Sequence, residues 1–233
     1  DNSCLYFIDL SSKASEKRKM RMGGSSIMRL KKEFEYKPPK LDFPDGLHHS
    51  FKIIQYCIEK GYILSGHDKS DGGLITTLLE MAFSSNKGLH IHIPKDIDNN
   101  QIHEFLFNEE IGFVVEISKK YIRLISELFE KYDIRFEPIA FSLKDNLIEI
   151  TQNFNLVYHQ SMTTLRNYWE YSSNYLEKLQ CNPKCVDSET EFLKTLYKPN
   201  YRFNELSYSK LFKNNFNVAV IREEGCNSDR EIA

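Results

Sequence analysis

The stretch His67-Asp68-Lys69-Ser70-Asp71-Gly72-Gly73-Leu74-Ile75 places two carboxylates, a hydroxyl and a glycine pair between two apolar segments. Residues 62–64 form the short apolar run of a strand, and residues 74–83 have the composition of a helix. A helix start leaves about four backbone N–H groups unpaired and carries about half a positive charge, so it attracts anions. Strand, acidic loop and helix together are the layout of a phosphate and metal site.

Each residue type in this loop has a chemical use at such a site. Glycines at positions 72 and 73 let a phosphate approach the backbone closely, and Asp68 offers hard oxygen to a cation such as Mg²⁺. The same residues also fit a plain helix start, in which Ser70 or Asp71 caps the helix and the glycines make the turn. The spacing alone leaves both interpretations open.

The composition is that of a soluble globular protein. The chain has 233 residues, of which 41% are hydrophobic and 27% charged, and its formal net charge is −2. This length allows a hydrophobic core and one or two domains. Because no apolar run approaches the roughly 20 residues of a membrane-spanning helix, and the charge is slightly negative, we expect neither a membrane nor a nucleic-acid partner.

Cysteines and basic residues give weaker signals. Five scattered cysteines with no secretory signal before them predict reduced thiols and a cytoplasmic protein. Cys181 and Cys185 lack a further ligand pair at zinc spacing, so a zinc site is not expected there. Basic residues crowd the N-terminal region, notably between Lys13 and Arg21, and a solvated loop is the expectation for most of them.

Apolar periodicity predicts a mixed series of strands and helices. Strands are expected at residues 4–10, 62–65, 89–94, 111–117, 136–141 and 147–150, and helices at 47–60, 74–85, 100–108 and 121–132. The two element types do not alternate strictly. The expected fold class is therefore α+β, with a three-layer arrangement in which helices cover a mixed sheet.

The character of the chain changes from Ser161 onward. Residues 165–180 and 187–197 have helical periodicity, and Asn182-Pro183 is expected to end the first of these helices. Residues 198–215 have little periodicity and indicate a linker. Residues 217–221 then form a fresh apolar run, which predicts the first strand of a new domain.

Five separated segments together resemble one enzyme family. They are residues 66–83, Leu106-Phe107-Asn108-Glu109-Glu110-Ile111-Gly112, Met22-Gly23-Gly24-Ser25, residues 165–185 around Trp169, and Val218-Ala219-Val220-Ile221-Arg222-Glu223-Glu224-Gly225-Cys226-Asn227. In this order they resemble phosphoribosylformylglycinamidine synthase, the large glutamine-dependent ligase of purine biosynthesis. Residues 66–83, which resemble the family's nucleotide-binding signature, would on their own also admit aminoimidazole ribonucleotide synthetase, selenophosphate synthetase and thiamine monophosphate kinase. The last two segments exclude these relatives.

The resemblance implies a division into three parts. Residues 1–158 would be the C-terminal domain of the second synthetase repeat, similar in fold to the C-terminal domain of aminoimidazole ribonucleotide synthetase. Residues 159–215 would be a helical connector and linker. Residues 216–233 would begin a flavodoxin-like class I glutaminase domain, which is truncated here, so upstream synthetase and downstream glutaminase segments would be missing.

The resemblance also implies a reaction and a set of ligands. The full enzyme would convert formylglycinamide ribonucleotide, ATP and glutamine to formylglycinamidine ribonucleotide, with ATP/ADP and Mg²⁺ as cofactors. Asp68 would be a magnesium ligand and Ser70 would contact the nucleotide, while Asp71, Gly72 and Gly73 would shape the nucleotide-binding turn. The other metal ligands would lie upstream and the glutaminase nucleophile downstream, so no catalytic residue is expected in this chain.

An alternative stays within the same family. The resemblance implies an enzyme with two related halves, one catalytic and one that holds a nucleotide as part of the scaffold. Asp68 and Ser70 could belong to the scaffold half. In either case we expect the isolated chain to be inactive.

Overall fold

The computed structural model describes residues 2–35 and 37–194, in which seven strands form one mixed sheet. The strand order is β2-β4-β1-β5-β3-β6-β7. The strands are β1 (Ser3–Asp9), β2 (Ile63–Asp68), β3 (Gly88–Ile93), β4 (Gly112–Ser118), β5 (Arg135–Leu143), β6 (Leu147–Gln152) and β7 (Asn155–Ser161). Strands β3 and β6 pair in parallel, whereas the other neighbours are antiparallel.

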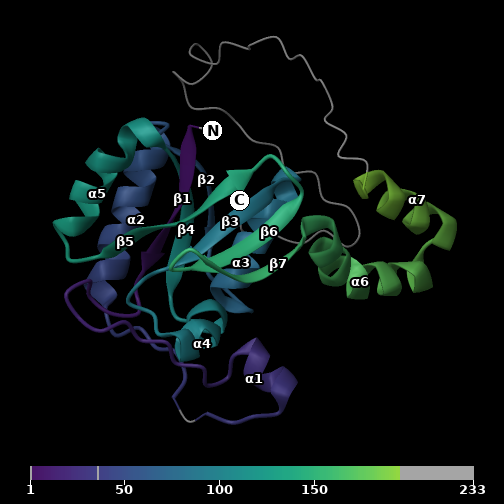
Figure 1. The fold of residues 1–233 in the computed structure, drawn as a ribbon, viewed down its shortest axis with the longest axis horizontal. Coiled ribbons are helices and arrows are strands. Elements are labelled where there is room, and N and C mark those ends of the chain that lie inside the picture. The colour runs from purple at the N-terminus through teal and green to yellow at the C-terminus, as the bar shows by residue number, and fades with distance from the viewer. Residues whose placement is uncertain (1, 36, 195–233) are drawn as a thin grey trace, which may run out of the picture. The chain divides into compact units, whose positions relative to one another are not determined.

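Helices cover both faces of this sheet. They are α1 (Ser26–Lys31), α2 (Pro44–Glu59), α3 (Gly73–Ser85), α4 (Ile102–Phe107), α5 (Ile122–Glu130), α6 (Met162–Gln180) and α7 (Pro183–Lys194), with 3-10 turns at Asn99–Gln101 and Lys119–Tyr121. Helices α2 and α5 contribute to one apolar core, while α3 and α4 contribute to the other. The pair α2 and α5 is visible at the left of Figure 1.

Strand β1 explains why two separate cores exist. Side chains of a strand point alternately to opposite faces. Leu5 and Phe7 accordingly lie in the core beneath α3 and α4, whereas Tyr6 and Ile8 lie in the core beneath α2 and α5. The central strand is thus buried on both sides, and the predicted α+β fold with a mixed sheet between helical layers is confirmed.

Strand β7 was not predicted from the sequence. Asn153 and Phe154 connect β6 to β7, with φ angles of 48° and 67°. A two-residue hairpin with both φ angles positive matches the twist of the flanking strands, but Asn-Gly or Asp-Gly is the usual signal for it. The turn could not be predicted from the sequence, because an aromatic residue such as Phe154 is typical of a strand.

Two helices follow β7, as the periodicity of residues 165–180 and 187–197 predicts, but the second begins earlier than expected. Helix α7 begins at Pro183 and not at residue 187, because the side chain of Asn182 accepts a 3.1 Å hydrogen bond from the N–H of Lys184. Proline suits the first helical position, where its missing N–H costs nothing. The expected boundary after residue 158 falls inside β7, and the expected strand at 217–221 lies outside the described residues.

The described helices include none that combines the length and the apolar character needed to cross a bilayer.

Candidate functional site

The acidic loop joins an edge strand to helix α3, which packs in one of the two cores. Strand β2 ends at Asp68 and helix α3 begins at Gly73, and the Gly73 N–H donates a 3.0 Å hydrogen bond to the carbonyl of Ser70. Gly72 and Gly73 have φ angles of 84° and 75°. A Cβ on Gly73 would lie 2.7 Å from the carbonyl oxygen of Asn108. Both conformation and space therefore require glycine at position 73.

The loop sorts its side chains between solvent and interior. The side chain of Asp68 is 65% exposed, and Ser70 and Asp71 are exposed as well, whereas Lys69 is buried. The Ser70 hydroxyl donates a short hydrogen bond to Oδ2 of Asp68. That bond is the main cause of the lowered pKa of the Asp68 carboxyl, which desolvation opposes. The two residues predicted to hold metal and nucleotide thus lie together and face outward.

The alternative in which Ser70 or Asp71 caps the helix is wrong. The N-cap of α3 is Gly72, and no side chain makes a capping hydrogen bond there. Instead, the N–H of Gly72 donates a 2.8 Å hydrogen bond to Oε1 of Glu109, a residue from a distant loop.

Lys69 points into the protein, which sequence reasoning did not predict. Its Nζ donates a 2.7 Å hydrogen bond to Oδ1 of Asn108 and lies 5.3 Å from the centre of the Phe7 ring. Burial lowers the pKa of Lys69 to about 8, although the carboxylates of Asp9 and Glu110 oppose this shift. Lys69 therefore fixes the loop to the protein interior, and its ammonium group is not available to a ligand at the surface.

His67 and Glu80 extend the site toward helix α6. Nε2 of His67 lies 2.9 Å from Oε2 of Glu80, and Nδ1 lies 2.7 Å from the carbonyl oxygen of Asp68. The indole N–H of Trp169 donates a 3.1 Å hydrogen bond to Oε1 of Glu80. The same three side chains line a groove of about 840 Å³ beside the loop. No pattern in the sequence relates these positions, because they come from three elements.

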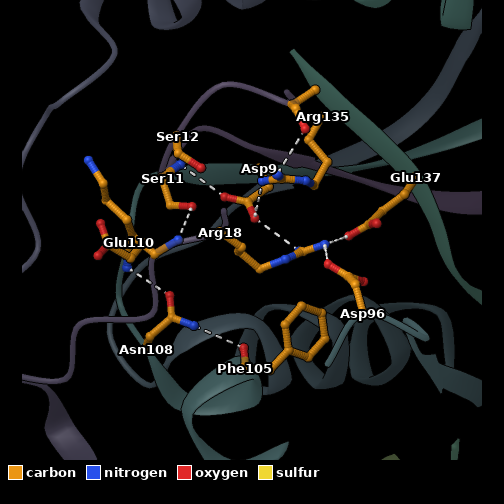
Figure 2. A network of polar contacts seen from close by, with 12 residues as sticks. Asp9, Ser11, Ser12, Arg18, Asp96, Phe105, Asn108, Glu110, Arg135 and Glu137 are labelled. Atoms are coloured by element: carbon orange, nitrogen blue, oxygen red, sulfur yellow. Dashed lines mark hydrogen bonds and ion pairs between the residues drawn. The ribbon is translucent and has the colours of Figure 1, made fainter. Parts of the chain in front are cut away.

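Part of the basic segment near the N-terminus is held in ion pairs. Arg18 is buried and lies 2.9 Å from Asp9 and 2.6 Å from Glu137 (Figure 2). Lys19 lies 2.8 Å from Asp42. Arg18 and Lys19 are thus exceptions to the expected solvated loop, whereas Lys13 and Lys17 are exposed. The partners of the two exceptions lie on other strands and loops and could not be found from local charge.

A magnesium ion fits the donors that the loop presents. Mg²⁺ is usually bound by one or two carboxylates, with phosphate oxygens and water completing its shell. Asp68 provides one exposed carboxylate, and Ser70 a neighbouring hydroxyl. Among residues 2–35 and 37–194, no group of three or more His, Cys, Asp and Glu side chains is arranged to hold a metal ion. Asp68 would thus form one wall of a site that other groups complete.

Comparison with known proteins gives consistent matches. The family described as AIR synthase related protein, C-terminal domain, matches residues 14–147. A protein of Arabidopsis thaliana named probable phosphoribosylformylglycinamidine synthase, chloroplastic/mitochondrial, is 36% identical over 240 residues, which cover 100% of this chain and 16% of that protein. The phosphoribosylformylglycinamidine synthase of Homo sapiens is 31% identical over 221 residues, covering 91% of this chain and 16% of that protein.

The solved structures agree on the fold. Thermotoga maritima PurL complexed with ATP has a TM-score of 0.54 and 15% identity, over 70% of this chain and 25% of that chain. The chain spans only 16–19% of the length of its relatives from Arabidopsis, Dictyostelium discoideum and Homo sapiens. Because the family model matches more than half of the chain, the chain belongs to the family described as AIR synthase related protein, C-terminal domain.

Proposed function

We propose that this chain is part of phosphoribosylformylglycinamidine synthase, the carbon–nitrogen ligase that converts formylglycinamide ribonucleotide, ATP and glutamine to formylglycinamidine ribonucleotide. The observation that carries the proposal is the outward-facing pair of Asp68 and Ser70 at the start of α3. Similarity along the whole chain to proteins with that name supports it, as does the fold shared with T. maritima PurL, which has been solved with ATP, ADP, AMPPCP and FGAR.

In this proposal the loop binds a magnesium–nucleotide complex. Asp68 donates a carboxylate oxygen to Mg²⁺, and Ser70 hydrogen-bonds a phosphate oxygen of ATP or ADP. Asp71, Gly72 and Gly73 hold the turn that presents these two side chains. The groove beside His67, Glu80 and Trp169 is large enough to take part of a small molecule. When bound, the cation neutralises charge on the phosphates.

The remaining parts of the proposal concern organisation and location. We assign residues 1–158 to the second synthetase repeat, residues 159–215 to a connector, and residues 216–233 to the start of a glutaminase domain. Glutamine would be the ammonia source. We propose a cytoplasmic enzyme because the cysteines show no sign of an oxidising compartment, whereas the Arabidopsis relative is named chloroplastic/mitochondrial. Fluorescence of the tagged full-length protein in cells decides between these locations.

The second candidate is the scaffold half of the same enzyme, holding its nucleotide without turnover. The observation that favours it is the internal bonding of the loop, since the N–H groups of both Gly72 and Gly73 already have acceptors within the protein. A loop fixed in this way suits a nucleotide that stays bound. The two candidates differ in what the loss of Asp68 does to the reaction.

The test uses the full-length enzyme with Asp68→Asn and, as a matched control, Asp145→Asn in the exposed β5–β6 loop. We expect Asp68→Asn to lower magnesium and nucleotide content, because one formal charge leaves the shell of the cation, while Asp145→Asn leaves both unchanged. A catalytic site predicts loss of turnover that exceeds any loss of thermal stability. A scaffold site predicts loss of stability with turnover preserved in the remaining folded enzyme. Unchanged magnesium and nucleotide content in Asp68→Asn would contradict both candidates.

A further inference from the structure

Glu109 connects two glycine turns that are far apart in the sequence. Its Oε1 accepts hydrogen bonds from the N–H groups of Gly72 and Ser26, both at 2.8 Å. Gly72 lies 37 positions away and Ser26 lies 83 positions away. One carboxylate oxygen therefore holds the acidic loop against the turn at residues 23–26.

The neighbours of Glu109 make its position rigid. Asn108 accepts the hydrogen bond from Lys69, and its own amide donates to the carbonyl of Glu104 at 2.6 Å. Glu110 is completely buried and pairs with Arg21 at 2.5 Å. Residues 108–110 are thus fixed on both sides of Glu109, so its carboxylate is presented to the two turns with little freedom.

This arrangement changes how a phosphate can be bound at the loop. A glycine turn before a helix commonly offers its backbone N–H groups to a phosphate. Here the Gly72 N–H is bonded to Glu109, and the Gly73 N–H is bonded to the carbonyl of Ser70. A phosphate aimed at Gly72 would also meet the negative charge of Glu109, and like charges at such distances repel. With these two N–H groups taken, a phosphate can be held by a cation at Asp68 and by the Ser70 hydroxyl, whose present hydrogen bond to Asp68 such a cation would replace.

We propose that Glu109 is a positioning residue of the nucleotide site. It fixes the acidic loop and, by taking the Gly72 N–H, leaves the phosphates of a nucleoside di- or triphosphate to Mg²⁺ at Asp68 and to Ser70. The inference rests on the proposed function and deepens it. It predicts that nucleotide binding at this loop depends on a divalent cation.

Two substitutions in the full-length enzyme separate the hydrogen bonds from the bulk of the side chain. Glu109→Ala leaves the Gly72 and Ser26 N–H groups without their acceptor, whereas Glu109→Gln keeps an acceptor oxygen at the same place. Residues that orient metal ligands commonly change affinity by about 10–100-fold when removed. For ADP with Mg²⁺, measured by titration calorimetry, we therefore expect Glu109→Ala to lose about tenfold or more in affinity. Glu109→Gln should bind close to wild type.

Two further measurements distinguish positioning from general destabilisation. Acetate can fill the space left in Glu109→Ala and accept both hydrogen bonds, so we expect added acetate to restore much of the lost affinity, whereas added chloride at equal ionic strength should not. The wild-type enzyme with ADP and EDTA should show no binding at this site. This last measurement needs no variant and stands even where Glu109→Ala fails to fold.

Three results would contradict the role of Glu109. Wild-type affinity in Glu109→Ala, a loss in folded Glu109→Ala that acetate does not reverse, or equal ADP binding with and without the cation would each overturn the inference. The Asp68→Asn variant measured in parallel keeps the two proposals apart. A weakened Asp68→Asn with an unaffected Glu109→Ala contradicts only the role of Glu109, whereas an unaffected Asp68→Asn contradicts the proposed function itself.

Discussion

The guanidinium of Arg18 lies 2.9 Å from the carboxylate of Asp9, and both side chains are at most 4% exposed. Glu137 approaches the same guanidinium at 2.6 Å, and Asp96 approaches it at 3.5 Å (Figure 2). These carboxylates raise the pKa of Arg18 against the opposing effect of burial, so the group stays charged. Strand β1, strand β5 and the N-terminal loop meet at this cation.

Removing Arg18 should be strongly destabilising. Arg18→Ala leaves Asp9 buried without its main counter-charge, and breaking a buried pair in this way costs about 3–5 kcal/mol. Urea unfolding of the chain measures the effect. Arg123→Ala provides the control, because its pair with Glu127 is exposed and is worth about 0.5 kcal/mol or less. Similar losses in the two variants would contradict a structural role for the Arg18 network.

The two glycines with positive φ at positions 24 and 73 should differ in their tolerance of alanine. A Cβ on Gly24 would meet open space. Gly24→Ala should therefore lower the free energy of unfolding by about 1 kcal/mol, the cost of a left-handed conformation for alanine. A Cβ on Gly73 would also press against the carbonyl oxygens of Asn108 and Leu106, at 2.7 and 2.8 Å. Gly73→Ala should therefore cost about 3 kcal/mol. Equal midpoints of thermal unfolding would show that the loop can shift away.

The cysteines should differ sharply in reactivity. Cys57 is completely buried in the core beneath α2, and burial raises the pKa of its thiol to about 11, whereas Cys181 and Cys185 are exposed. Only the thiolate is nucleophilic. At pH 8, iodoacetamide should label Cys181 and Cys185 in the folded protein, and should label Cys57 only after denaturant is added. Peptide mass spectrometry reads each site. Comparable labelling of Cys57 in the native state would contradict its burial.

A polypeptide of these 233 residues alone should have no synthase activity with glutamine or with ammonia. Asp68 and Ser70 form only one wall of the proposed site, and no catalytic residue is assigned to this chain. The assay follows formation of formylglycinamidine ribonucleotide, with the full-length enzyme as the positive control. Measurable turnover by the short chain would mean that the described residues contain more of the active site than we propose.

The order of strands and helices could be predicted from the sequence because the apolar periodicity is strong. The prediction failed at the β6–β7 hairpin, where Phe154 adopts a backbone conformation that is usual for glycine. The predicted start of α7 at residue 187 was also wrong, because Asn182-Pro183 both ends one helix and begins the next. In both places the backbone conformation cannot be predicted from the residue types.

The candidate site was only partly accessible to sequence reasoning. The loop itself, with Asp68 and Ser70, could be found because its residues are contiguous. Glu109 and Lys69 could not be given roles, since their partners lie in other segments. The bond from Glu109 to Ser26 crosses 83 positions, and the bond from Lys69 to Asn108 crosses 39. Contacts of this range follow from the fold and not from a local pattern.

The most direct test of the account is a crystal structure of the full-length enzyme grown with ADP and Mn²⁺, a magnesium substitute that gives an anomalous signal. The account predicts an anomalous peak in direct contact with the carboxylate of Asp68. It also predicts a phosphate oxygen of ADP beside both the metal and the Ser70 hydroxyl, with Glu109 still bonded to the Gly72 N–H. Fully bound ADP and Mn²⁺ elsewhere, with Asp68 and Ser70 facing only solvent, would contradict it.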